Sequence, residues 1–148
     1  MCFTQVEAEA AHLRALQQQF NVAALNCQTT NPEDPTFTER YNRFIRLFSK
    51  ELQDNSDTLY RHFGKDGRAL DRWMTRVANL AGQSVIRNPD FCQVAWDRLE
   101  EVAALAPAQL RKYVVLTEAA GDLAPACVPE KKTPSAVAER VSKSTLRQ

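Results

Sequence analysis

Cys92 lies near the start of a predicted helix, in the stretch "NPDFCQVAW" at residues 88–96. Asn88 is suited to cap that helix, Pro89 to fill its first position and Asp90 to complement the positive end of its dipole. A cysteine in this position has three alternative roles. It is a reactive thiol with a lowered pKa, a buried thiol that packs as a small hydrophobic group, or half of a disulfide.

Other spacings that could support chemistry are incomplete. Glu9 and His12 have the Glu-x-x-His spacing of di-iron bundles, but Leu59 stands three positions before the other histidine, His62. The sequence has no Cys-x-x-Cys, no histidine pair and no glycine-rich phosphate loop. We therefore expect no catalytic residue, no metal site and no cofactor, and a surface position for His12. Ser-His-Asp catalysis has candidate serines without a recognisable arrangement: Ser49, Ser56 and Ser84.

Two rows of arginines indicate binding. Rows of this kind can hold an anionic partner, although acidic neighbours also make such rows ordinary solvated helix faces. The net charge is −3 over residues 1–36, +3 over 37–90 and +1 over 91–148, well short of a dedicated nucleic-acid binder. We expect another protein or an anionic envelope component as the partner, and no nucleic acid. The first row is Arg40, Arg43 and Arg46, followed by Lys50, and the second is Arg68, Arg72 and Arg76.

The composition favours helices over strands. The chain has 148 residues, the size of one domain, with 44% hydrophobic residues and only four glycines. Apolar residues recur at steps of three and four along five stretches. They predict five helices, with apolar stripes from Cys2 to Cys27, from Phe37 to Phe63, from Leu70 to Val85 in a helix that begins near Asp66, and from Cys92 to Ala106 in the helix that Pro89 begins, and then a helix over residues 107–120 that Gly121 ends.

Local signals set the ends of the second predicted helix. Thr36 and Glu39 have capping-box spacing, and Gly64 is placed to end the helix. The polar cluster "QDNSD" at residues 53–57 weakens its middle, so a kink is expected there. The fold class that follows is all-α, an up-down four-helix bundle with a short fifth helix. The bundle spans residues 1–128, and residues 129–148 form a basic, mostly flexible tail.

The bundle topology bears on Cys92. In an up-down arrangement the first helix ends, and the fourth begins, at the same pole. Cys27 and Cys92 both fall on the core-facing stripes that we predict for these helices, and the first and fourth helices are neighbours. The topology therefore favours a disulfide between them, although buried free thiols and a reactive Cys92 remain the alternatives.

Cys2 and Cys127 are the other two cysteines. Cys2 precedes the first helix, and the loop that carries Cys127 can return to that end, so a disulfide that joins the termini is expected. A lipid-modified Cys2 is the alternative. An even number of cysteines that pair in this way points to an oxidising compartment.

Four short motifs carry a resemblance to a known group. In order they are "LRALQQQFNVAALNC", "YNRF", "RVANLAGQS" and "FCQ". They resemble a group of small secreted helical proteins of bacteria that contain disulfides and have no assigned activity. The resemblance covers about residues 2–127, implies secretion, helices and disulfides, and supplies no catalytic residues.

These observations predict a non-enzymatic helical binding module, or an accessory or scaffold subunit. We expect it in the periplasm or secreted, with a cytoplasmic location as the alternative because the sequence shows no leader pattern. No apolar run approaches the roughly 20 residues of a membrane span. The alternative functions are a thiol-redox protein that uses Cys92 or Cys127, and an enzyme of unrecognised class.

Overall fold

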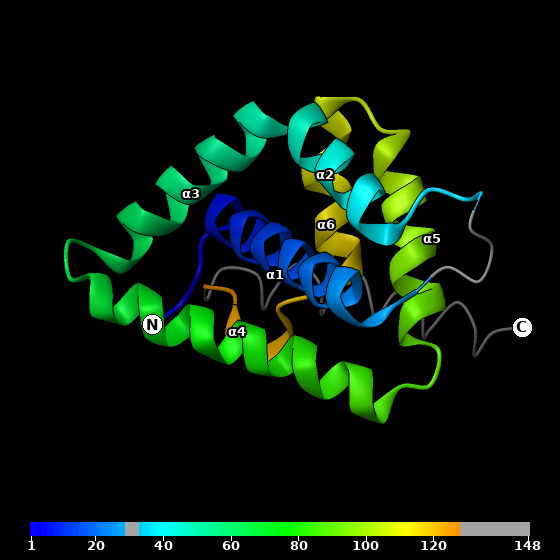
Figure 1. The fold of residues 1–148 in the computed structure, drawn as a ribbon. Helices are drawn as coiled ribbons and strands as arrows, with labels where there is room; N and C mark the ends of the chain where they lie inside the picture. Colours follow the sequence, from blue (N-terminus) through cyan, green and yellow to red (C-terminus); the bar gives the residue numbers. More distant parts are fainter. Residues whose placement is uncertain (29–32, 128–148) are drawn as a thin grey trace, which may run out of the picture.

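Helices make up most of the computed structural model, which describes residues 1–28 and 33–127. The described part contains no strand beyond an isolated bridge between Phe3 and Ala126, so the predicted all-α class is confirmed. In chain order the elements are α1 (Gln5–Asn26), α2 (Phe37–Leu47), α3 (Ser49–Phe63), α4 (Gly67–Arg87), α5 (Phe91–Ala103), α6 (Pro107–Thr117) and the 3-10 turn η1 (Gly121–Leu123) (Figure 1).

Two of the helices begin with a capping box. At α2 the backbone N–H of Thr36 donates to Glu39 at 2.8 Å and the N–H of Glu39 donates to the Thr36 hydroxyl at 3.1 Å, as the sequence predicts. Thr4 and Glu7 form the same box at α1, which the sequence analysis did not predict. Gly64, at φ 79°, ends α3 as expected.

Helix α1 is the centre of the fold. It packs against each of the other five helices, with α4 along one side, α2 and α3 along another and α6 behind it in the view of Figure 1. The many alanines let neighbouring helices approach closely on several faces. The fold is therefore a central helix with five around it, which differs from the regular up-down bundle expected. The buried residues of α1 are Ala10, Ala11, Leu13, Ala15, Leu16, Phe20 and Ala23.

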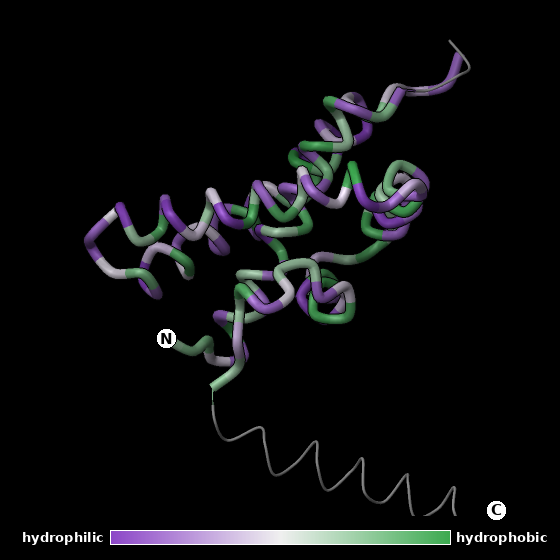
Figure 2. Tube along the Cα trace, turned by 90° about the horizontal axis from the view of Figure 1, so that it is seen from below, coloured by the Kyte–Doolittle hydropathy of each residue, from purple (hydrophilic) through white to green (hydrophobic). Residues whose placement is uncertain are grey.

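The surrounding helices are amphipathic. Hydrophobic and hydrophilic residues alternate along their turns in Figure 2, as expected where one face packs on α1 and the other meets solvent. Phe20 of α1 packs against Phe44 of α2 with ring centroids 5.4 Å apart. The hydrophobic core is continuous, and it extends from Phe3 at the N-terminal end to Val114 in α6.

The long second helix predicted from Phe37 to Phe63 is two helices. The break lies at Phe48, with φ −115° and ψ 26°, and not in the polar cluster 53–57. Phe48 is only 2% exposed, so the break places its side chain in the core. The polar cluster stays helical because it bonds to α1: Asn55, 1% exposed, donates through Nδ2 to the carbonyl of Ala10 at 3.0 Å.

The later helix ends also differ from the predictions. Ala106 precedes α6 and is exposed, so it is not part of the buried stripe of α5. Helix α6 ends at Thr117 because Glu118 adopts a left-handed conformation at φ 48°, and Gly121 begins η1. The predicted tail over 129–148 lies outside the described residues.

Candidate functional site

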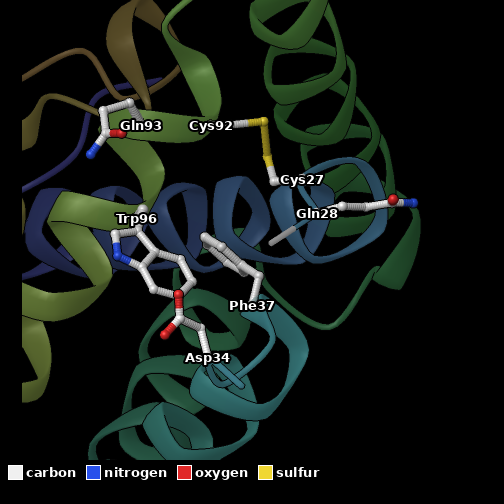
Figure 3. Close-up of a pocket in the computed structure, with 7 residues that line it drawn as sticks. All are labelled: Cys27, Gln28, Asp34, Phe37, Cys92, Gln93 and Trp96. Atoms are coloured by element: carbon white, nitrogen blue, oxygen red, sulfur yellow. A yellow bond between two sulfur atoms is a disulfide. The ribbon is translucent and has the colours of Figure 1, made fainter. Parts of the chain in front are cut away.

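The disulfide between Cys27 and Cys92 joins the end of α1 to the start of α5 (Figure 3). The two Cα atoms lie 5.5 Å apart, within the usual range for a disulfide. The predicted pairing is therefore present, and so is the common pole on which the argument depended.

The predicted inward orientation of Cys92 is wrong. Asn88 accepts a hydrogen bond from the Asp90 N–H at 3.0 Å, and this turn delays the start of α5 to Phe91. Phe91, 6% exposed, leads the buried stripe of α5, whereas Cys92 is exposed. The bridge consequently lies at the surface.

A pocket of about 350 Å³ opens beside this disulfide. The rings of Phe37 and Trp96 form its apolar wall, with centroids 5.8 Å apart, and Asp34 and Gln93 contribute polar groups (Figure 3). All four cysteines of the chain are in disulfides. Neither Cys92 nor Cys127 is a free thiol, so a redox role for either would run through a disulfide.

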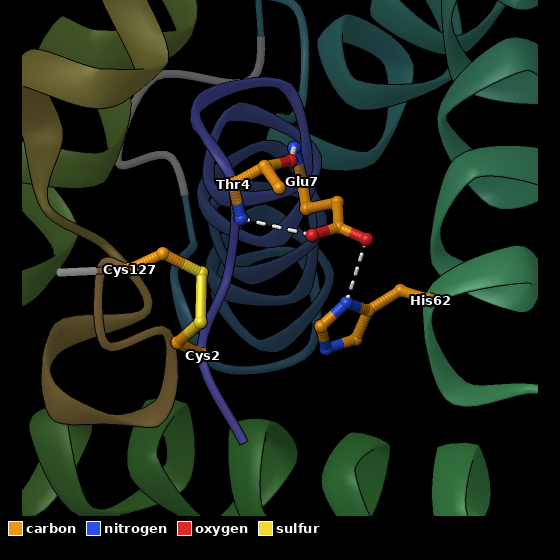
Figure 4. Close-up of a disulfide and its surroundings, with 5 residues drawn as sticks. All are labelled: Cys2, Thr4, Glu7, His62 and Cys127. Atoms are coloured by element: carbon orange, nitrogen blue, oxygen red, sulfur yellow. Dashed lines mark hydrogen bonds and ion pairs between the residues drawn. A yellow bond between two sulfur atoms is a disulfide. The ribbon is translucent and has the colours of Figure 1, made fainter. Parts of the chain in front are cut away.

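The second disulfide joins the two ends of the described domain (Figure 4). Cys2 and Cys127 have Cα atoms 4.8 Å apart, which confirms the expected pairing and is incompatible with a lipid on the Cys2 sulfur. Backbone hydrogen bonds flank the bridge: the N–H of Phe3 donates to Pro125 at 2.8 Å, and the N–H of Cys127 donates to Phe3 at 3.0 Å.

His62 forms a buried contact with α1 that the sequence analysis did not predict. Its side chain is 5% exposed, and its Nδ1 lies 2.8 Å from the Glu7 carboxylate (Figure 4). The imidazole also stacks on Phe3, with ring centroids 4.1 Å apart. The hydrogen bond from the Thr4 backbone N–H, reinforced by His62, lowers the pKa of Glu7. The Thr4–Glu7 spacing was the available signal, but nothing local marks His62 as the partner.

Glu7→Gln is expected to flatten the acid side of the stability profile. Because the folded pKa of Glu7 lies below its usual 4.5, the carboxylate stabilises the fold above pH 4.5. That contribution is lost as the pH falls from 4.5 through the lower folded pKa. Urea unfolding at intervals from about pH 3 to pH 6 measures the free energy of unfolding. This free energy should be lower in the variant than in wild type at pH 6, and the two values should converge toward pH 3.

Glu39→Gln is the matched control for this change. Glu39 holds the same capping position on α2 but contacts no histidine among the described residues. At pH 6 its free energy of unfolding should differ from that of wild type by less than that of Glu7→Gln does. A constant difference between Glu7→Gln and wild type across the whole pH range would contradict the assignment.

His12 is half-buried, so its predicted surface position is wrong. Its Nδ1 accepts a hydrogen bond from the Ala120 N–H at 3.1 Å, and burial lowers its pKa. This contact ties α1 to the segment after α6. Glu9, three residues earlier, lies 3.9 Å from Arg111. Within residues 1–28 and 33–127, no three His, Cys, Asp or Glu side chains gather in a cluster suited to a metal ion.

Two of the three serines considered for catalysis, Ser56 and Ser84, bond to helix groups. The hydroxyl of Ser56 accepts a hydrogen bond from Arg14 at 2.7 Å and donates to the Leu52 carbonyl at 3.1 Å. Ser84 donates to the carbonyl of Leu80 at 3.0 Å. The bond of Ser84 lies within α4, and the bonds of Ser56 lie within α3 and between α3 and α1. Both side chains therefore stabilise the helices.

The first arginine row lies where α2 packs on α5. Arg40 is engaged, because its guanidinium lies 3.0 Å from Glu100 and 4.3 Å from the ring centre of Trp96. Arg43 and Arg46 are exposed and form no ion pair within the described part of the chain. All three arginines line one pocket of about 280 Å³, so the structure brings this row together.

The second row lies on α4, beside the N-terminal segment. Arg68, Arg72 and Arg76 are all exposed, and none has an ion pair among residues 1–28 and 33–127. Arg72 and Arg76 line a pocket of about 320 Å³ that includes Trp73, whereas Arg68 lies outside it. The two rows therefore serve different pockets.

The fold and these features define a small all-α domain whose described residues form two disulfides and two pockets lined by the predicted arginine rows. Comparisons with protein-family models, with curated proteins and with solved structures give no match. Of the features that the resemblance to secreted bacterial proteins implies, the structure supports the small size, the helices and the disulfides. None of the described helices has the length and apolar character needed to cross a membrane.

Proposed function

We propose that this protein is a non-enzymatic binding domain of an oxidising compartment outside the cytoplasm, periplasmic or secreted. Two disulfides support the compartment, because such bridges persist where thiols are not kept reduced. In this role the domain is an accessory or scaffold subunit for another protein or for an anionic envelope component.

One observation carries the proposal. Four exposed arginines, two beside each pocket, have no carboxylate partner in the part of the chain that the structure describes. A guanidinium with a free fork is suited to carboxylate or phosphate groups of a partner. Arg40 differs from these four because Glu100 already neutralises it. These four pocket-lining arginines are Arg43, Arg46, Arg72 and Arg76.

Binding to two defined anionic probes tests the proposal. Polyglutamate represents an acidic protein, and vesicles that contain phosphatidylglycerol represent an anionic envelope surface. The wild-type protein should bind at least one probe, with an affinity that falls as salt rises. The double variants Arg43→Gln/Arg46→Gln and Arg72→Gln/Arg76→Gln should identify the row involved through a loss of about tenfold.

Lys65→Gln/Arg87→Gln is the matched control for charge. It removes two exposed cations that line neither pocket. If the control lowers affinity as much as the arginine pairs do, binding reflects net charge alone and the proposal is wrong. Failure of both probes to bind wild type would also overturn it.

Thiol–disulfide exchange at Cys27–Cys92 is the second candidate function. Its supporting observation is that Cys92 is exposed beside a pocket with an aromatic wall. Equilibration with dithiothreitol buffers gives the reduction potential of the bridge. A value above about −250 mV would support exchange, and a value below about −300 mV would indicate a purely structural bridge.

A further inference from the structure

The pocket on α4 is assembled from four separate parts of the chain. Arg72, Trp73 and Arg76 come from α4, Phe3 from the N-terminal segment, Phe63 from the end of α3, and Leu123 and Asp122 from η1. Several of these residues are fixed by interactions of their own. The indole N–H of Trp73 donates to the Leu123 carbonyl at 2.8 Å, and the Cys2–Cys127 bridge adjoins Phe3.

The floor of this pocket is aromatic. Phe63 and Trp73 have ring centroids 5.5 Å apart, and Phe3 lies 6.1 Å from Phe63 and 6.2 Å from Trp73. Phe3 and Trp73 are themselves buried, so the ring surface that reaches the pocket is held rigidly. A floor of this kind favours an apolar group over a hydrated phosphate.

The rim of the pocket carries an excess of positive charge. Arg72 and Arg76 lie one helical turn apart on α4, so their guanidinium groups can converge on one anion. Asp122 is the opposing charge among the residues that line the pocket, and it lies beyond 4.0 Å from both arginines. One negative group against two positive groups leaves the rim suited to a single carboxylate.

These features together select one kind of group on a polypeptide. Aspartate and glutamate carry a carboxylate without a large apolar body, and an internal leucine or phenylalanine carries an apolar body without a charge. Among unmodified residues, both occur on one residue only at the carboxyl end of a chain. A pocket of about 320 Å³ is at the small end for a ligand site, which fits one residue better than a longer segment.

We propose that this pocket binds the carboxyl-terminal residue of a partner polypeptide, with a large apolar side chain on Phe63 and Trp73 and the terminal carboxylate on Arg72 and Arg76. This inference rests on the proposed binding function and names the chemistry of its partner. It assigns no such role to Arg43 or Arg46, whose pocket lacks the aromatic floor.

Calorimetric titration with matched pentapeptides tests the inference. One peptide ends in phenylalanine with a free carboxylate, the second is the same peptide amidated, and the third ends in alanine with a free carboxylate. The first should bind about tenfold more tightly than either of the others. In NMR spectra, the indole N–H resonance of Trp73 should shift when this peptide binds. The chain has two tryptophans, so the variant Trp96→Phe identifies which indole resonance belongs to Trp73.

Charge variants give opposite expected signs. Arg72→Gln/Arg76→Gln should weaken binding of the first peptide by about tenfold or more, whereas Asp122→Asn should strengthen it by about twofold to threefold. Arg43→Gln/Arg46→Gln is the matched control and should leave the affinity unchanged. All these side chains are exposed, including the three that border the pocket, so unaltered thermal unfolding is expected.

Equal binding of the free and amidated peptides, or wild-type affinity in Arg72→Gln/Arg76→Gln, would overturn the inference. The general proposal fails separately. If polyglutamate and vesicle binding depend on the arginines while no peptide binds, the binding function stands and the terminal-residue inference falls. If the peptides bind as expected but neither anionic probe does, the proposal of a general anionic partner is wrong. The assignment of this pocket to a carboxyl-terminal residue then stands.

Discussion

Replacing both Cys27 and Cys92 with serine is expected to lower the free energy of unfolding by about 4 kcal/mol. The bridge closes a loop of 65 residues, and opening it returns conformational entropy to the unfolded chain. For a chain of this size the loss corresponds to a fall in Tm on the order of 10 °C. Thermal and urea unfolding under non-reducing conditions measure both quantities.

The single variants test the bridge itself. Cys27→Ser or Cys92→Ser alone should cost nearly as much as the double variant, because either change removes the same covalent bond. Cys92 is exposed, so the new hydroxyl brings little cost from burial. Losses that simply add would show that the two cysteines contribute independently, which contradicts the bridge. The mass of the unreduced wild-type protein should also lack four hydrogen atoms, two for each disulfide.

The pole at which these cysteines meet was predictable from the sequence because it depends on coarse features. Helix direction alternates from one predicted helix to the next, and an error of a few residues in a boundary does not change the end at which a helix begins. The same coarseness explains the error in orientation. The buried stripe of α5 begins at Phe91 and not at Cys92, which leaves Cys92 at the correct end of the helix but on its exposed side.

The break at Phe48 was not predictable from local propensity. Residues 53–57 are the weaker helix formers, yet they stay helical because Asn55 and Ser56 find partners on α1. Phe48 has no sequence signal for a break, and tertiary packing of its ring in the core decides the geometry there. Contacts between distant segments thus override the local preferences in both places.

The sequence predicted only the basic part of the pocket on α4. The spacing of Arg72 and Arg76 marks a basic face, but the aromatic floor comes from residues that are up to 70 positions away, since Phe3 and Trp73 meet only in the fold. The Glu7–His62 contact has the same origin, as α1 and the end of α3 are adjacent in space and far apart in sequence. No periodicity within one helix encodes such a pairing.

Cys2→Ser/Cys127→Ser is expected to affect both stability and binding. The Cys2–Cys127 bridge spans 125 residues, but Cys27–Cys92 already shortens the path between the ends of that loop. The entropy that the outer bridge removes is therefore similar to that of the inner bridge, and we again expect a loss of about 4 kcal/mol. Urea unfolding beside Cys27→Ser/Cys92→Ser compares the two directly.

The effect on binding should differ between the two pairs of variants. Phe3, Leu123 and Pro125 line the pocket on α4, and the outer bridge holds the two segments that carry them. Without it, backbone hydrogen bonds from Phe3 to Pro125 and Cys127, the Trp73–Leu123 bond and the burial of Phe3 hold these segments without a covalent link, so more of the pocket must be ordered when the ligand binds. At a temperature well below both Tm values, Cys2→Ser/Cys127→Ser should bind the phenylalanine-ended peptide about tenfold more weakly than Cys27→Ser/Cys92→Ser does. Equal affinities would show that the Cys2–Cys127 disulfide contributes to stability alone, and that the pocket keeps its shape without it.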